Sequence, residues 1–260
     1  MRRLNSLLII TAMSGLLMPA ADARAGGIVE LPAVADAFVS GANPNNNYGA
    51  AGGLAVSAAG LPRGEFQSVL RFNSSAATSL LDAQFGVGQW TIQAVQLQLT
   101  ATSPNNPIFN ASAGGLFSIR WLQSDAWAEG AGSPSVPSMS GITFNSLPGF
   151  LTPTDEAVGT FNFGGVVAGS ATYPLLAAGA FIADLSSGGD VSLHLLPADS
   201  SVSMVVHSRN FGDSNARPRL LLSVVPEPGV LSLILPIFVL IVRRGTRHTP
   251  VHAISRSNRH

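Results

Sequence analysis

Gln93-Ala94-Val95-Gln96-Leu97-Gln98-Leu99 alternates polar and apolar side chains. In a β-strand this period of two places Val95, Leu97 and Leu99 on one face and the glutamines on the other. Such a pattern is typical of a strand that lies between a hydrophobic core and a more polar surface. The segment therefore predicts a β fold with one-sided strands.

Other short apolar segments extend this prediction along the chain. We expect strands at 37–40, 54–57, 67–72, 116–122, 191–196, 202–207 and 220–225. Spacers rich in Asn and Pro, such as 43–47 and 103–107, separate them, and the Asn and Gly residues of 43–49 are expected to adopt positive φ. This pattern predicts an all-β fold, an antiparallel two-sheet β-sandwich (jelly-roll-like).

Two segments interrupt the strand pattern. Residues 175–185 predict one short helix that Gly188-Gly189 ends. Gly, Pro and Ser recur throughout 130–173, which we expect to be a long loop with one short strand at 142–145.

The N-terminus has the three parts of a secretory signal peptide in the right order. Arg2-Arg3 is followed by the mostly apolar stretch 4–18 and by Ala23-Arg24-Ala25, a small-x-small cleavage site, with Ala21-Asp22-Ala23 as the alternative. We therefore predict a signal helix over 1–25 and export of the remaining chain.

The C-terminus carries a second address. Pro226-Glu227-Pro228 precedes the apolar run 229–242 and the pair Arg243-Arg244. The prolines oppose helix at the tripeptide, the apolar run predicts a short hydrophobic helix, and the arginines prefer the cytoplasmic side of a membrane.

This layout resembles the PEP-CTERM sorting signal of exported bacterial proteins. The resemblance implies that 226–244 is a transient membrane anchor, that an exosortase-type enzyme processes it, and that 245–260 is a basic cytoplasmic tail. As a helix, 14 residues span about 21 Å, which is shorter than a hydrocarbon core of about 30 Å. Pro236 interrupts the run, and sixteen residues follow Arg244. These departures favour a weak, removable anchor over a permanent span.

Between these ends, residues 26–225 form an acidic body. They contain six Arg and twelve Asp or Glu, a net charge of about −6, and the chain has no lysine. An acidic body without a basic stripe argues against nucleic-acid binding. The absence of cysteine excludes disulfides, thiol catalysis and zinc–thiolate sites.

Several short pieces of the body recur in an order that suggests a known module. They are 36–39, 43–49, 54–56, 68–72, 94–97, 127–130, 141–145, 207–210 and 217–220. Their order resembles the DNRLRE domain, a β-sandwich of exported bacterial proteins that is related to carbohydrate-binding modules. The resemblance implies a single domain over 26–225 and polysaccharide as a ligand class.

The residues that best suit sugar contact are an aromatic side chain and its polar neighbours. Trp127 lies in a loop-like acidic segment, so we predict ligand contact there, with Glu129 and Tyr48 as further candidates. Arg71, inside an apolar strand, is expected to pair with Asp36 or Glu65.

Catalytic and metal chemistry have weaker support in the sequence. Asp125 and Glu129 flank Trp127, and a glycosidase needs two carboxyl groups beside its sugar. His194 lies in an alternating strand and is expected to face solvent with Ser192. No EF-hand spacing occurs, so a structural Ca²⁺ would have unassigned ligands, and no other cofactor is expected.

The sequence as a whole predicts a non-enzymatic exported protein of the cell envelope or extracellular matrix that binds polysaccharide. Two alternatives stay open. One is a structural surface or adhesion module without a specific ligand, and the other is a polysaccharide-degrading enzyme.

Overall fold

A computed structural model describes residues 26–104, 111–177 and 179–227. The predicted signal helix, the apolar run, the basic tail and the sorting residues Pro228, Arg243 and Arg244 lie outside these ranges. Among the described residues, no helix is both long and apolar enough to cross a membrane.

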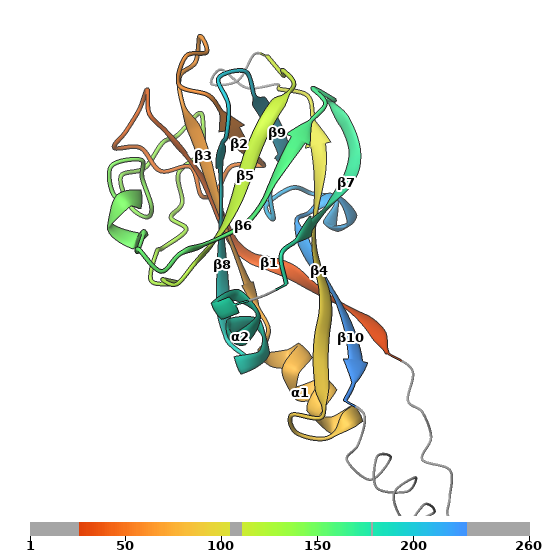
Figure 1. The fold of residues 1–260 in the computed structure, drawn as a ribbon. Coiled ribbons are helices and arrows are strands. Elements are labelled where there is room, and N and C mark those ends of the chain that lie inside the picture. The colour runs from red at the N-terminus through yellow and green to blue at the C-terminus, as the bar shows by residue number, and fades with distance from the viewer. Residues whose placement is uncertain (1–25, 105–110, 178, 228–260) are drawn as a thin grey trace, which may run out of the picture.

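The described chain is mostly β-structure (Figure 1). Its elements are β1 (Gly27–Ser40), β2 (Gly53–Ser57), β3 (Phe66–Asn73), α1 (Ser75–Phe85), β4 (Trp90–Thr102), β5 (Gly115–Leu122), η1 (Leu147–Phe150), β6 (Glu156–Phe163), β7 (Ala168–Leu175), α2 (Gly179–Ser187), β8 (Asp190–Pro197), β9 (Ser203–His207), η2 (Ser214–Ala216) and β10 (Arg219–Pro226). Every pairing between these strands is antiparallel, as the sequence predicts.

The strands are joined into one sheet that closes on itself. Its closed part has the order β1-β10-β4-β9-β2-β3, and β3 pairs again with β1. Strands β8, β5 and β6 continue outward from β3, and β7 pairs with β4. The expected all-β fold is therefore confirmed, whereas its division into two separate sheets is not, because the hydrogen bonding links the strands into a closed six-stranded ring with extra strands.

Strand β1 makes this closure possible because it serves two partners in turn. Its first half pairs with β10, from Gly27↔Val224 to Pro32↔Arg219. Its second half pairs with β3, and the register shifts between Ala33 and Ala35. An irregularity of this kind bends a strand and increases its twist, which turns β1 from one neighbour to the other.

The main core fills the space that the strands enclose. In β4 the side chains of Val95, Leu97 and Leu99 are buried while Gln96 and Gln98 are only partly covered, as the alternation predicts. Both α-helices lie at the end where β4 begins (Figure 1). They add Leu81 and Phe181 to the core.

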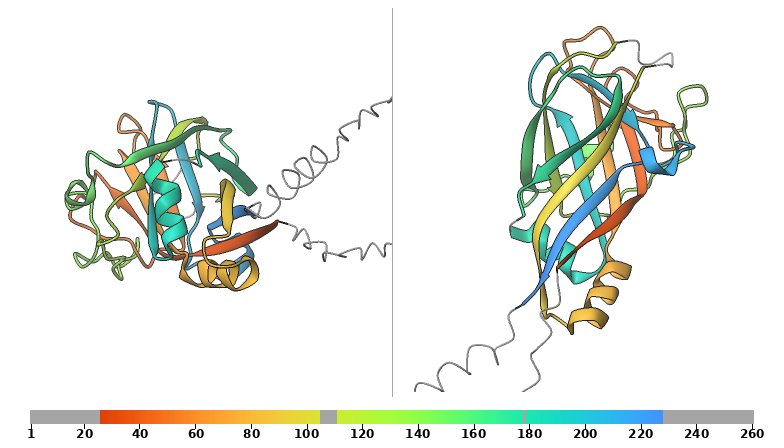
Figure 2. Two further views of the ribbon diagram at one scale, coloured as in Figure 1. Left: turned by 60° about the horizontal axis from the view of Figure 1, so that its bottom comes forward. Right: turned by 90° about the vertical axis from the view of Figure 1, so that its right-hand side faces the viewer.

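A second, smaller core lies outside the ring, under the long loop between β5 and β6. It joins Ala35, Ala37 and Val39 of β1 to Trp127 and Ile142 of the loop. The second half of β1 is consequently buried on both faces, with no exposed residue from Ala35 to Ser40. Figure 2 shows this loop against the strands from two further directions.

The second core explains why the predicted orientation of His194 is wrong. Five successive residues of β8, Val191 to Leu195, are buried, and His194 is 2% exposed. Alternation exposes every second side chain only where one face of the sheet meets water. The outer face of this strand is covered instead.

Several predicted boundaries also differ from the structure. Strands β6 and β7 and helix α1 were not expected, and 142–145 is not a strand. Helix α2 ends just before Gly188, as predicted, and Gly188 has a φ of +78°. The helix begins at Gly179 rather than at Leu175, because Leu175 is the last residue of β7. Strand β10 ends at Pro226, one residue later than expected, and the Glu227 N–H donates to the Gln89 carbonyl.

Candidate binding pocket

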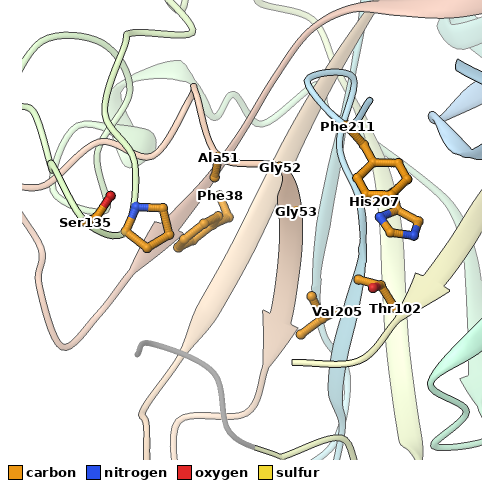
Figure 3. A pocket seen from close by; sticks show the side chains of 10 residues that line it. Phe38, Ala51, Gly52, Gly53, Thr102, Ser135, Val205, His207 and Phe211 are labelled. Atoms are coloured by element: carbon orange, nitrogen blue, oxygen red, sulfur yellow. The ribbon is translucent and has the colours of Figure 1, made fainter. Parts of the chain in front are cut away.

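A pocket of about 420 Å³ opens where β2 begins and β9 ends. Figure 3 shows Phe38 and Ser135 on one side of it and His207 and Phe211 on the other, with Gly52 and Gly53 between them. Its lining residues are Phe38, Ala51, Gly52, Gly53, Thr102, Pro134, Ser135, Val205, His207 and Phe211. Its volume is within the range of about 300–1,000 Å³ that is usual for small-ligand sites.

One wall of the pocket is a pair of stacked rings. The centroids of His207 and Phe211 are 3.6 Å apart, and their planes differ by 23°. Burial lowers the pKa of His207 from 6.5, against the opposing effect of Asp213, so the imidazole is uncharged at neutral pH. The wall is therefore flat, aromatic and neutral.

The floor of the pocket is open because Gly52 has no side chain. A Cβ added at Gly52 would meet nothing within 4 Å, and the backbone there is not in the left-handed region. A side chain at this position would therefore begin in open space next to the other lining residues.

The wall that carries Ser135 is held by one buried amide. Asn47 is 0% exposed, and its Nδ2 donates to the carbonyls of Glu129 and Ile142, both at 2.7 Å. Its Oδ1 accepts from the N–H groups of Gly49 and Gly132, both at 3.1 Å. One side chain thus ties the loop at three places to the segment that leads into β2.

Gly49 is needed here for close approach and not, as expected, for positive φ. A Cβ at Gly49 would lie 2.0 Å from the Glu129 carbonyl oxygen. Within the described residues, only glycines have positive φ, and Gly49 is not among them.

The opposite wall is held in the same way. The Ser208 hydroxyl donates to the Ala51 carbonyl at 2.5 Å, and Asn210 Nδ2 donates to the Gly49 carbonyl at 2.8 Å. The stacked ring of Phe211 follows directly along the chain, so these bonds fix the position of the aromatic wall relative to the floor.

An ion pair connects the two walls. Arg209 Nε donates to Glu129 Oε1 at 2.6 Å, and the second carboxylate oxygen bonds Arg209 Nη2. The side chain of Glu129 is only 17% exposed. Glu129 therefore joins the two loops instead of pointing into the pocket.

Asp36 lies beneath this pair and is almost completely buried. Its Oδ2 accepts the Arg209 N–H at 2.7 Å, and its Oδ1 has no hydrogen-bond partner among the described residues. Burial raises the pKa of Asp36 from 3.8 to about 7, and the nearby Glu129 charge adds to the effect, while Arg209 opposes it. The carboxyl therefore keeps its proton at pH values at which an exposed Asp is ionised.

Neither aromatic candidate for sugar contact, Trp127 or Tyr48, has the exposed face that such contact needs. Trp127 is 1% exposed and donates from Nε1 to the Ser192 hydroxyl at 2.9 Å, so it packs in the second core. Tyr48 is 2% exposed and stacks on Phe38, with centroids 4.4 Å apart. Tyr48 supports the pocket from behind, and Trp127 does not line it.

The predicted partners of Arg71 are wrong as well. Its guanidinium lies 4.4 Å from the centroid of the Trp127 ring and forms an ion pair with Asp190 at 3.6 Å. Asp36 and Glu65 are used elsewhere, Asp36 by Arg209 and Glu65 by Gln67. Arg71 therefore links its strand β3 to the long loop that covers β3 and β8, and not to the predicted carboxylates Asp36 or Glu65.

The other proposed carboxylate, Asp125, is separate from this pocket. Burial raises the pKa of Asp125 to about 6, although a hydrogen bond from Ser192 lowers it. The charges of Asp184 and Asp190 raise it further. Asp125 and Glu129 have different partners, so they are not arranged as a pair. Within the described ranges, no group of three or more His, Asp or Glu side chains could hold a metal ion.

The residues that line the pocket were missed by sequence reasoning. Phe211 lies between Asn210 and Gly212, Gly52 lies between Ala51 and Gly53, and no spacing connects the two. The signal that could have found the site is the set of pieces at 43–49, 127–130 and 207–210, because these pieces meet around the pocket. A comparison with protein-family models finds none that matches this chain, and a comparison with curated proteins finds no match either.

Proposed function

We propose that this chain is an exported, non-enzymatic protein of the cell envelope or extracellular matrix that binds polysaccharide in the pocket between Ser135 and Phe211. The jelly-roll-like kinship to carbohydrate-binding modules and the processing of 226–244 by an exosortase-type enzyme belong to the same proposal.

One observation carries the binding part of the proposal. Three segments far apart in the sequence, 47–53, 129–135 and 207–211, build the pocket, and buried polar groups hold each of them. Loops fixed on a rigid β scaffold present a ligand with a preformed surface, which lowers the entropic cost of binding. The stacked rings of His207 and Phe211 supply the flat face that suits a sugar ring.

The lining of the pocket favours binding over hydrolysis. Its ten residues include no Asp or Glu. Glycoside hydrolysis usually needs two carboxyl groups on either side of the scissile bond. Polysaccharide held in this pocket would therefore meet no acid or base of the required kind from the lining.

The position of the pocket suits a protein that is anchored at its C-terminal end. Strand β4 begins at Trp90, which pairs with Pro226, and ends at Thr102, which lines the pocket. Twelve residue steps at about 3.3 Å each span about 40 Å. An anchor beyond Pro226 would thus hold the ligand site away from the membrane surface.

The binding proposal is tested by filling the pocket. In polysaccharide pull-downs with the mature secreted protein, Gly52→Trp should abolish retention. Gly164→Trp is the matched control, because a Cβ at Gly164 also meets nothing within 4 Å and this residue lies between β6 and β7. Equal retention of both variants would contradict the proposal.

The sorting proposal is tested by mass spectrometry of the mature protein from its host. We expect an N-terminus near Gly26 and a C-terminus close to Pro226. A secreted form that still ends at His260 would refute processing at the tripeptide, without bearing on the pocket.

The exposed edge strand β7 favours a second candidate function, that of a structural module that self-associates. Among the described strands this one pairs only with β4, and residues 157–183 contain no charge. Natural sheet edges are usually protected by charged residues. Self-assembly of the purified protein that Thr172→Lys prevents would support this alternative, and a monomer at all concentrations would exclude it.

A further inference from the structure

We infer that the pocket is built for an uncharged sugar unit, and that carboxylated, sulfated and cationic polysaccharides are poor ligands. This inference rests on the proposed function, and it names the ligand class of that same pocket.

Among the described residues, the lining contains no side chain that could neutralise an ionic ligand. Of its ten residues, only Thr102, Ser135 and His207 have polar side chains, and none of the three is charged at neutral pH. Hydroxyl and imidazole groups exchange hydrogen bonds with sugar hydroxyls. An ionised group that enters the pocket would instead lose water without gaining a counter-charge.

The charged residues near the pocket are already engaged with one another. The guanidinium of Arg209 is bonded to both carboxylate oxygens of Glu129. Asp36 is buried beneath them and accepts the Arg209 backbone N–H. A ligand carboxylate could recruit Arg209 only by breaking this pair, which would leave Glu129 partly buried without its partner.

For carboxylated and sulfated polysaccharides, the field of the whole body acts in the same direction. A net charge of about −6 over residues 26–225 repels polyanions before they reach the pocket. Asp213, close enough to affect the pKa of His207, adds a negative charge on the side of the aromatic wall.

The shape of the pocket agrees with a neutral ring. The apolar face of a sugar can lie on the stacked rings of His207 and Phe211, and the open space at Gly52 leaves room for its hydroxyl groups. Uncharged sugars owe much of their affinity to such ring contacts, because their hydroxyls gain little over water.

The test uses polymers that differ only in charge. Dextran, mannan and laminarin are each compared with their carboxymethyl and diethylaminoethyl derivatives, by titration calorimetry at physiological ionic strength. We expect at least one neutral polymer to bind, both derivatives of it to bind at least tenfold more weakly, and Gly52→Trp to remove the binding. Phe211→Ala, which removes the ring wall, should weaken it at least tenfold, and Gly164→Trp should leave it unchanged.

The remaining outcomes separate the inference from the proposed function. If a carboxymethyl or diethylaminoethyl derivative binds as tightly as its parent and Gly52→Trp abolishes this, the pocket binds polysaccharide but the inference is wrong. If no polymer shows binding that depends on Gly52, the proposed function fails and the inference fails with it. Circular dichroism and melting temperature of each variant establish that it is folded.

Discussion

Replacing Asp36 by Asn should remove a dependence of stability on pH that the buried carboxyl imposes on the fold. Burial raises the pKa of Asp36 from 3.8 to about 7, and the nearby Glu129 charge adds to the effect. In the part of the chain that the structure describes, its Oδ1 has no hydrogen-bond partner and its Oδ2 accepts the Arg209 N–H. Between these two values the native state binds a proton that the unfolded chain releases. The contribution of Asp36 to the free energy of unfolding is therefore fully present below pH 4. It is lost as the pH rises through 7.

The size of the effect follows from the two pKa values. A tenfold change in an equilibrium constant is worth about 1.4 kcal/mol, so a change from 3.8 to about 7 amounts to about 4 kcal/mol at most. Asn is neutral at every pH, and its side-chain oxygen can accept the same Arg209 N–H. The variant and the wild type should thus be similarly stable near pH 4, and the variant should be up to about 4 kcal/mol more stable at pH 8.

The assay is urea unfolding at half-unit pH steps from 4.5 to 8, at constant ionic strength, with the free energy of unfolding obtained by linear extrapolation. Asp125, whose pKa is about 6, titrates in both proteins and cancels in the difference. Asp199→Asn is the control: this exposed carboxyl has its pKa lowered by the Leu116 N–H and other donors, so it stays ionised throughout this range. Parallel curves for wild type and Asp36→Asn between pH 5 and 7 would refute the reasoning, because they would show that Asp36 is ionised in the native state.

Three further predictions concern the supports of the pocket and the second core. Trp127→Ala should lower the free energy of unfolding by about 3–5 kcal/mol in urea titrations, as expected for a buried Trp. The protein that stays folded should still bind polysaccharide. Loss of binding at unchanged stability would contradict the placement of Trp127 in the second core. Asn47→Ala leaves four backbone groups without their partner, at about 1–3 kcal/mol for each group that stays unsatisfied, so limited proteolysis should cut the loop at 130–141 faster than in the wild type. Gly49→Ala should lower the melting temperature sharply, because the new Cβ would lie 2.0 Å from the Glu129 carbonyl oxygen. Gly52→Ala should leave the melting temperature nearly unchanged, because its Cβ would meet nothing within 4 Å. Equal shifts of the melting temperature in both variants would argue against the close contact between Gly49 and the Glu129 backbone.

Strand β4 shows how much of the fold could be predicted from the sequence. Its alternation survives in the structure because the strand has one face in the main core, and this single fact sets the polarity of every second side chain. Strands β2, β3, β5, β8, β9 and β10 were found within one or two residues because each is a short apolar segment between turn-rich spacers, although β2, β8 and β9 are buried on both faces. Strands β6 and β7 were missed because they lie at sheet edges. Strand β7 exposes most of its residues and β6 buries only Val158 and Phe163, which leaves no clear apolar period to detect.

The pocket could be predicted only in pieces. Asn47, Glu129 and Arg209 belong to segments that the sequence singles out, yet their roles depend on contacts between residues 80 or more positions apart. The sequence also suggested Trp127 as a platform for sugar contact, because it lies in a loop-like acidic segment. It is buried because the loop folds back over β1 and β3, and no local pattern records that.

The amino-acid sequence by itself determined the strands with one apolar face, the acidic character of the body and the absence of thiol chemistry, because these properties depend on residue type and on spacings of a few positions. The tertiary structure alone decided which outer faces are covered, which carboxylates are buried and which loops meet around Gly52. These outcomes depend on how β1 bends between two partners and on where the long loop packs. Burial and desolvation, which set the state of Asp36 and His194, exist only once distant segments are in contact.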